Sequence, residues 1–199
     1  YIGGQLLGAF LAAAALFSLF EPFHTALEVA HDAERGDRNS VVTAMCFGEY
    51  FPNPGALAGS RKPVDAESWE AHWNSYSVVS AAFAEWLGTG ILAFVVLAVS
   101  RPGNRAVPER LGPVFIGLTV TALICVLAPL TQACFNPARD FGPRLFAYLA
   151  GWGEVAFPGP NGFGCLIVYL CAPILGAVCG GGLHDALFLA NRGDEVAAD

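Results

Sequence analysis

The sequence predicts an all-α membrane protein with four membrane-spanning helices and one shorter half-helix that enters and leaves the bilayer on the same side. Hydrophobic residues make up 55% of the chain and charged residues only 14%, whereas a typical soluble domain is about a quarter charged. The apolar residues form long runs, each near the roughly 20 residues that a helix needs to cross about 30 Å of hydrocarbon. One run is too long for a single span and contains an Asn-Pro step. These observations place the chain in a lipid bilayer.

Four segments have the length and composition of a membrane span. They are residues 1–20, 78–100, 112–132 and 163–190. Between the first and second spans, residues 21–77 are too charged to enter lipid, and they are expected to form a long extracellular loop. A short helix is expected in this loop around Thr25–Arg35. The histidines of the loop, His24, His31 and His72, are expected to be solvated.

The short segment between the second and third spans fixes the orientation of the chain. It contains Arg101, Arg105, Arg110 and Glu109. Short loops rich in arginine stay on the cytoplasmic side of the membrane. The second span is therefore expected to run inward and the third outward, which puts the loop 21–77 outside and the acidic tail 191–199 in the cytoplasm.

The apolar run 112–150 cannot be one span, and it is interrupted at Asn136-Pro137. Asn is a favoured N-cap and Pro is favoured at the first helical position, so a helix is expected to restart there. A helix from Pro137 to Tyr148 would be about 18 Å long, which is roughly half a bilayer. Because the third span ends outside and the fourth begins outside, residues 133–150 are expected to form a re-entrant loop with a half-helix.

The residues before this half-helix are expected to face water. Irregular backbone at membrane depth survives only where protein or a water-filled cavity satisfies its polar groups. Thr131 to Phe135 would then offer carbonyl groups to a pore. The half-helix would direct its electropositive N-terminus at the membrane midplane.

A distinctive pattern begins at the break: Asn-Pro-Ala-Arg-Asp at 136–140, Phe-Gly-Pro-Arg at 141–144 and Gly-Trp-Gly at 151–153. This pattern resembles the second signature loop of the major intrinsic proteins, the aquaporin family. Asp140 and Arg144 resemble its glycerol-facilitator, or aquaglyceroporin, branch.

The resemblance extends over essentially the whole chain. Tyr50 to Pro54 resembles the Tyr-Pro-Asn-Pro of the outer loop in glycerol facilitators, and residues 83–85 resemble the fourth helix of the family. An internal repeat relates residues 1–9 to residues 169–177, as inverted repeats do in transport folds. Two pairs of small residues in these repeats suit close helix packing. They are Gly4 with Gly8, and Gly176 with Gly180.

The resemblance implies an aquaporin-like right-handed helix bundle, of which this chain would hold four of six spans and one of two half-helices. The chain opens at Tyr1 inside an apolar run, and Asn53-Pro54 is followed by Gly55 rather than Ala. It is therefore expected to be a fragment that lacks the first Asn-Pro-Ala loop. Family resemblance also implies a homotetramer with one pore in each subunit.

The resemblance assigns roles to the residues at the start of the half-helix. Asn136 would donate from its side-chain amide to passing solutes, unless it serves only as an N-cap. Arg139 would be the selectivity arginine, which repels cations and donates to solute hydroxyls, or else it would form a structural ion pair with Asp140 or Glu85. Asp140 would stabilise the positive end of the half-helix.

The remaining filter positions follow by counting back from Asn136. Ala133 stands where glycerol facilitators have Phe, and Ile124 stands where they have Gly and water-selective members have His. The complete set expected at the pore is Asn136, Pro137, Ala138, Arg139, Ala133, Ile124, Cys134 and Phe135. Tyr169 departs from the glycerol branch, which favours Pro at that position.

Two residues are expected to support the structure. Glu85 lies about 12 Å into its span, where a carboxylate needs donors, and the free N–H groups of the re-entrant loop could supply them. A proton relay through Glu85 is the alternative. Gln5 matches the third helix of the family.

The sequence thus predicts a passive channel for glycerol and other small uncharged solutes, with water, in the cell membrane of a bacterium. A broader channel for urea or metalloid acids is the alternative, and a polytopic enzyme or a non-functional truncated product is remote. No cofactor or metal is expected, because the six cysteines show no metal-ligand spacing. No nucleic-acid partner is expected, because there is no basic stripe with interleaved aromatic residues.

Overall fold

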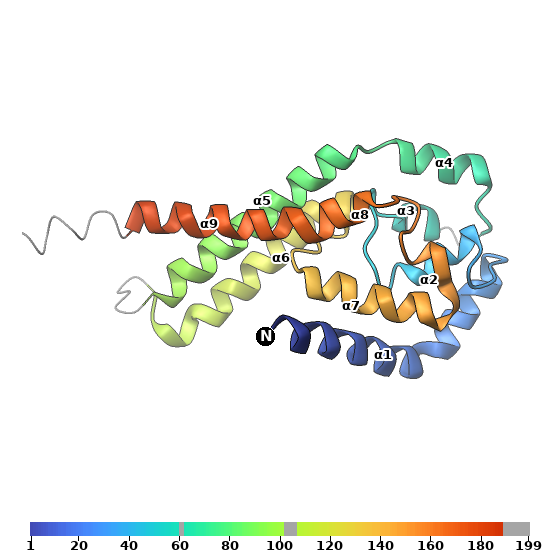
Figure 1. The fold of residues 1–199 in the computed structure, drawn as a ribbon, viewed down its shortest axis with the longest axis horizontal. Coiled ribbons are helices and arrows are strands. Elements are labelled where there is room, and N and C mark those ends of the chain that lie inside the picture. The colour runs from blue at the N-terminus through green and yellow to red at the C-terminus, as the bar shows by residue number, and fades with distance from the viewer. Residues whose placement is uncertain (60–61, 102–106, 189–199) are drawn as a thin grey trace, which may run out of the picture.

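The computed structural model describes residues 1–59, 62–101 and 107–188, and every regular element in these ranges is a helix (Figure 1). Four of the helices are long and apolar enough to cross a membrane. The predicted all-α fold is thereby confirmed. The predictions for Arg105 and for the tail 191–199 lie outside the described residues.

Three of the long helices pack side by side. The main elements after the first helix are α5 (Val78–Ser100), α6 (Gly112–Thr131), α7 (Pro137–Ala147), α8 (Gly164–Leu166) and α9 (Ala172–Phe188). A single π-helical turn, Ile167–Cys171, joins α8 to α9, so that these form one span from Gly164 to Phe188. Helix α5 packs along both α9 and α6, as Figure 1 shows.

Two glycines of α9 allow α5 to approach within backbone contact. A Cβ atom at Gly176 would lie 2.2 Å from the carbonyl oxygen of Trp86, and one at Gly180 would lie 2.0 Å from that of Gly90. A side chain larger than hydrogen cannot fit at either distance. The close packing predicted for this pair of small residues is therefore confirmed.

The first helix is longer than the sequence predicts. The predicted break between a span at 1–20 and a short helix around Thr25–Arg35 is wrong, because one helix, α1 (Ile2–Ala30), runs from the span into the first part of the second segment and ends before Arg35. Neither Glu21 nor Pro22 ends it. Proline removes one backbone hydrogen bond, but the helix continues because its outer turns are packed against the rest of the chain.

The outer turns of α1 are held by polar contacts. Glu28 accepts hydrogen bonds from the Thr43 hydroxyl at 2.9 Å and from Nε of Arg35 at 3.0 Å. His24 and His31 are 8% and 0% exposed, so the prediction that both are solvated is wrong. They lie on or just after α1, on the side that the outer loop covers.

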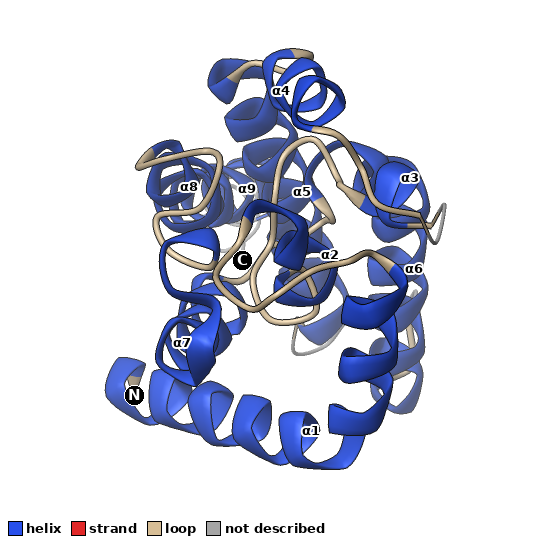
Figure 2. Ribbon diagram, turned by 90° about the vertical axis from the view of Figure 1, so that its right-hand side faces the viewer, coloured by secondary structure: helices blue, strands red, loops and turns tan. Residues whose placement is uncertain are grey.

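The long loop between α1 and α5 is compact and contains short helices. They are a 3-10 turn at Arg38–Ser40, α2 (Val41–Ala44), α3 (Gly55–Ala58) and α4 (Ala66–Asn74). Figure 2 looks onto the end of the molecule where these elements lie. Asp65 caps α4 by accepting from the Ser68 amide at 2.7 Å. The loop shares a packed interior with α1, α7 and the segment that follows α7.

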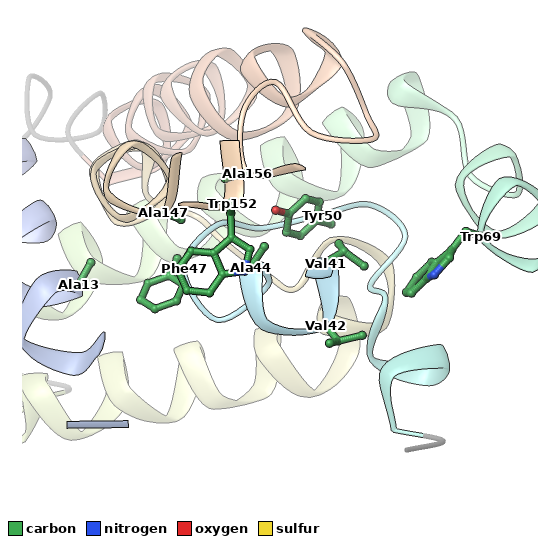
Figure 3. Packing of buried hydrophobic residues seen from close by; sticks show 10 residues of the cluster. All are labelled: Ala13, Val41, Val42, Ala44, Phe47, Tyr50, Trp69, Ala147, Trp152 and Ala156. Carbon is green, nitrogen blue, oxygen red and sulfur yellow. The ribbon is translucent and has the colours of Figure 1, made fainter. Parts of the chain in front are cut away.

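That interior is an aromatic and aliphatic cluster at the outer end of the molecule (Figure 3). Phe47 and Trp152 lie with ring centroids 5.1 Å apart. The indole N–H of Trp152 donates to the Thr43 hydroxyl at 2.9 Å, and that of Trp69 donates to the Asn39 side chain at 2.9 Å. Each buried indole thus keeps a hydrogen-bond partner while its ring fills the core.

The half-helix α7 lies along α1 (Figure 2). A Cβ atom at Gly142 would lie 2.8 Å from Cβ of Ala9 and 2.9 Å from the Leu6 carbonyl oxygen, so this glycine allows the contact. Gly4 and Gly8 of α1 pack differently: among the described residues, no atom of another element lies within 4 Å of a Cβ built at either one. The close packing predicted for this second pair is not found in the described residues.

Candidate functional site

The candidate site is the loop that joins α6 to α7 together with the first turn of α7. Helix α6 ends at Gln132, whose φ of 60° is left-handed. Ala133 and Phe135 also have positive φ, at 58° and 55°. Non-glycine residues adopt this conformation rarely and at a cost, so the surrounding structure must hold the loop.

Glu85 of α5 is the first group that holds this loop. Its side chain is 0% exposed, and its two carboxylate oxygens accept from the amides of Cys134 at 2.9 Å and Phe135 at 2.8 Å. The expectation that loop N–H groups would supply donors to this carboxylate agrees with this geometry. A buried carboxylate without such donors would be costly.

Asn136 begins the half-helix. Its backbone is extended, with φ −148° and ψ 109°, and its side-chain oxygen accepts from the amides of Ala138 at 3.0 Å and Arg139 at 3.3 Å. Pro137 follows at the first helical position. With its oxygen engaged by the helix, the side-chain amide of Asn136 is left to donate elsewhere.

A cavity of about 600 Å³ lies beside this end of α7. Its wall comes from α1, from the outer loop and from the half-helix. The lining residues are Gly4, Gln5, Gly8, Ala9, Ala12, Ala13, Leu16, Cys46, Phe47, Asn136, Ala138, Arg139 and Pro143. The wall is mostly small or apolar, and Asn136 and Arg139 add hydrogen-bond donors.

Arg139 lies on the first turn of α7 and reaches the cavity with 52% of its side chain exposed. Its guanidinium forms an ion pair with the carboxylate of Glu49, which is 1% exposed. The ion-pair partner is therefore an outer-loop residue, and neither Asp140 nor Glu85, the two partners considered from the sequence, pairs with Arg139 in the described residues.

Asp140 and Arg144 form a buried ion pair one helical turn apart. Oδ1 of Asp140 lies 2.7 Å from Nη2 of Arg144, and Oδ2 lies 3.0 Å from Nε. Asp140 also accepts from the Glu49 amide at 2.7 Å. Arg144 donates in turn to the carbonyl oxygens of Glu49 and of Ala156, the latter at 2.8 Å. The pair thus fastens the outer loop to the half-helix.

Two tyrosine rings enclose the Arg144 guanidinium. Its central carbon lies 5.2 Å from the Tyr50 ring centroid and 5.8 Å from that of Tyr169. Burial raises the pKa of Tyr50 above its ordinary value, so its phenol stays protonated and donates to the Val155 carbonyl at 2.9 Å. Tyr169 is a buried packing residue here, and its hydroxyl donates to the Thr131 carbonyl at 3.2 Å.

Residues 45–54, here called the outer strap, cross over the end of α6. The Gln132 side chain accepts from the Tyr50 amide at 2.9 Å. The Asn53 side chain donates to the Ala128 carbonyl at 2.9 Å, and its backbone amide donates to the Pro129 carbonyl at 3.3 Å. The strap therefore satisfies polar groups where the helix ends and the re-entrant loop begins.

The cavity gathers some of the residues predicted for the site and not others. Asn136, Ala138, Arg139 and Gln5 line it. Ala133, Cys134 and Phe135 are each less than a tenth exposed and pack into apolar clusters, and Ile124 lies on α6 with 42% of its surface exposed. None of these four lines this cavity.

Glu49 is a residue of the site that the sequence did not predict. A glutamate in an irregular loop follows no helical period, so nothing marked it as buried. The one available signal is its place directly before Tyr50, at the start of the outer-loop pattern that resembles glycerol facilitators.

A comparison with protein families matches the model described as Major intrinsic protein over residues 1–184. The chain belongs to the major intrinsic protein family. With its four apolar helices of spanning length, this family member is a multi-pass membrane protein.

Curated relatives in the major intrinsic protein family have similar sequences. The glycerol uptake facilitator protein of Haemophilus influenzae is 36% identical over 184 residues, which are 92% of this chain and 62% of that protein. The glycerol uptake facilitator protein of Escherichia coli K12 is 37% identical over 180 residues, or 90% of this chain and 57% of that protein. The propanediol uptake facilitator PduF of Citrobacter freundii is 35% identical over 191 residues, or 96% of this chain and 63% of that protein. The chain thus spans between 57% and 63% of the length of these relatives.

A solved structure supports the same fold for this member of the family. The X-ray structure of the aquaglyceroporin from Plasmodium falciparum matches with a TM-score of 0.68 at 19% identity, over 96% of this chain and 64% of that chain. The aquaporin-like fold that the sequence pattern predicts is thereby confirmed.

Proposed function

We propose that this chain forms the larger part of a passive channel for glycerol and other small uncharged solutes, which also passes water. The observation that carries the proposal is the arrangement at the start of α7. A capped half-helix directs its N-terminus, with Asn136 and Arg139, at a cavity whose other walls are small and apolar. The names of the relatives, glycerol and propanediol uptake facilitators, support the same class of solute.

The chemistry of this wall suits a polyol. The amide of Asn136 and the guanidinium of Arg139 would donate to successive hydroxyl oxygens, while the aliphatic side of the solute contacts the apolar wall. The electropositive end of the half-helix opposes cations, including hydronium. Passage needs no bond making and no cofactor, so the proposed activity is not enzymatic.

Further elements of the proposal rest on family membership alone. Ile124 and Ala133, with the backbone of Cys134 and Phe135, are proposed to line the lumen of the complete channel. A homotetramer in a bacterial inner membrane is proposed as its assembly and location. The bacterial origin of the cited relatives favours this location.

The test is solute uptake by the complete gene product reconstituted in lipid vesicles. Stopped-flow light scattering should show glycerol entry well above that of empty vesicles, and Arg139→Ala should lower the discrimination between glycerol and small cations. Water flux without any glycerol flux would reject the proposal. Wild-type vesicles that pass neither solute would reject the channel itself.

A broader solute range is the second candidate. The small Ala133 at a filter position, and the propanediol uptake facilitators among the relatives, favour it. The same vesicles, given 1,2-propanediol, urea or arsenite, distinguish the two ranges. Uptake of glycerol alone would leave the narrower function.

A further inference from the structure

A second cavity, of about 580 Å³, lies in the outer part of the molecule and shares no lining residue with the cavity at the start of α7. Three segments form its wall: residues 36–41, helix α4, and residues 154–160 after the half-helix. Its volume is in the range of small-molecule sites. The proposed passage of solutes gives this cavity no role.

Trp73 supplies an aromatic surface to this second cavity. Its indole stacks on that of Trp69, with ring centroids 5.4 Å apart and planes 6° from parallel. Trp69 is fully buried and is fixed by its hydrogen bond to Asn39. Trp73 is only half-buried, and its indole N–H donates to no group among the described residues. The cavity therefore has a flat apolar surface with an unused donor at its edge.

Four polar side chains line the same cavity: Arg38, Glu70, Asn74 and Glu154. All four residues are exposed, and none forms an ion pair in the part of the chain that the structure describes. Of these side chains, only that of Arg38 has a hydrogen bond within the described residues, a long one of 3.4 Å to the Ala66 carbonyl. The wall thus offers both donors and acceptors that protein groups leave unused.

The walls of this cavity are held in place by contacts of the protein itself. Asp37 accepts from the Ser40 amide at 2.9 Å, which fixes the turn that carries Arg38. The Tyr50 hydroxyl donates to the Val155 carbonyl at 2.9 Å, which fixes the segment after the half-helix. A site that is formed in advance loses little conformational entropy when a ligand binds.

We propose that this cavity is a binding site for a sugar ring, a neutral cyclic polyol. The C–H face of such a ring packs on an indole, while its hydroxyl groups donate to carboxylates and accept from a guanidinium or an indole N–H. The charge of Arg38 opposes a cation between Glu70 and Glu154, and the two carboxylates oppose an anion. A neutral ligand with hydroxyl groups around its rim suits both signs of charge. The ligand is held outside the pore, so the proposal does not depend on transport.

Saturation-transfer NMR of the complete gene product in lipid nanodiscs tests the proposal, with methyl β-D-glucopyranoside as the probe. We expect saturable binding with a Kd of about 1–10 mM, and Trp73→Ala should weaken it about tenfold. Glu67→Gln, exposed on α4 and outside the cavity, should bind like the wild type. The absence of saturable binding to the wild type would overturn the proposal, and so would equal affinities for the wild type and Trp73→Ala.

Two further variants keep the test decisive if Trp73→Ala does not fold. Trp73→Phe keeps a ring against Trp69 and should bind within about threefold of the wild type. The double change Glu70→Gln with Glu154→Gln alters only exposed side chains and should weaken binding about tenfold. Wild-type affinity in the double variant would overturn the proposal.

Comparison ligands separate a sugar ring from other chemistry. Choline carries a cation that suits an indole beside carboxylates, so a preference for choline over the glucoside would overturn the proposal. Glycerol lacks a ring face and should compete only at about tenfold higher concentration, whereas equal competition would also overturn it. Cellobiose distinguishes the two sources of a sugar ring. Tighter binding than the single ring supports a glycan chain as the ligand, and equal binding supports a free monosaccharide.

Discussion

Two buried carboxylates hold the backbone around the half-helix, and each uses a different partner. Glu85 accepts hydrogen bonds from two loop amides, those of Cys134 and Phe135. Asp140 accepts a hydrogen bond from one amide of the outer strap and pairs with the guanidinium of Arg144. Glu85 depends on two backbone amides of a loop in which Ala133 and Phe135 have positive φ. Asp140 depends on the charge of Arg144. Their loss should therefore have different costs.

Glu85→Ala should destabilise the protein by at least about 2 kcal/mol, because it leaves the amides of Cys134 and Phe135 buried without an acceptor. Thermal unfolding in detergent, followed by fluorescence-detected gel filtration, measures the effect. Glu70→Ala, an exposed glutamate on α4, is the matched control and should unfold at the wild-type temperature. Equal melting temperatures for the two variants would contradict the role given to Glu85.

Arg144→Met should cost about 3–5 kcal/mol of stability, the usual effect of removing one partner from a buried ion pair. Methionine keeps an unbranched chain about as long as the aliphatic part of arginine, so the main loss is the charge facing Asp140 together with the donors to Glu49 and Ala156. The same unfolding assay applies. Arg38→Met, at an exposed arginine of the outer loop, provides the control. A melting temperature near that of the control would show that the outer loop is held by other contacts.

At the scale of the helices, the crossing of α5 and α9 depends on the absence of side chains. The two backbones meet at Gly176 and Gly180, where van der Waals contact replaces the hydrophobic effect that lipid cannot supply. The contact is therefore sensitive to a single methyl group.

Gly180→Ala should lower stability by about 1–3 kcal/mol or more, because its new methyl carbon would lie 2.0 Å from a backbone oxygen. Gly182→Ala is the control on the same helix, since no described atom of another element lies within 4 Å of a Cβ built there. Its melting temperature should stay level or rise slightly, as alanine favours helix. If both substitutions behaved alike, the tight crossing would not exist in the membrane.

Helix boundaries were predictable where a capping residue meets an apolar run. Ser77 and Asn136 each cap a helix that begins at the expected residue. The end of α1 was not predictable, because Glu21 and Pro22 are ordinary stop signals. What overrides them is packing of the outer turns against residues of the loop, and a linear pattern does not contain that information.

At the scale of the whole molecule, the arginine-rich segment between α5 and α6 predicts one orientation in the membrane. The predicted cytoplasmic segment includes Glu109, and the predicted outer loop includes Glu67. Both glutamates are exposed. They therefore make suitable positions for labelling from one side of the membrane.

Glu67→Cys should react with a membrane-impermeant maleimide in intact cells, and Glu109→Cys should react only after permeabilisation. The background must first lose its exposed thiols, at Cys46, Cys125, Cys171 and Cys179. Each cysteine variant serves as the control for the other. The reverse labelling pattern would invert the proposed topology.

The parts of the site that lie on regular elements could be predicted from sequence, and the parts contributed by the loop could not. Asn136 and Arg139 follow a recognisable pattern, and Glu85 stands out as a lone charge in an apolar span. Glu49 meets Arg139 only because the outer strap folds back over α6. Such a contact joins residues about 90 positions apart, as the 95-residue separation of Glu49 and Arg144 illustrates.

The outer strap is attached to the half-helix through peptide groups, and this has an evolutionary consequence. Position 49 can exchange its side chain through single-codon changes while Asp140 and Arg144 keep the strap where it is. Substitutions should therefore be found among relatives more often at position 49 than at Asp140 or Arg144. The strap can change its side chains over evolutionary time while the ion pair beneath it is inherited unchanged.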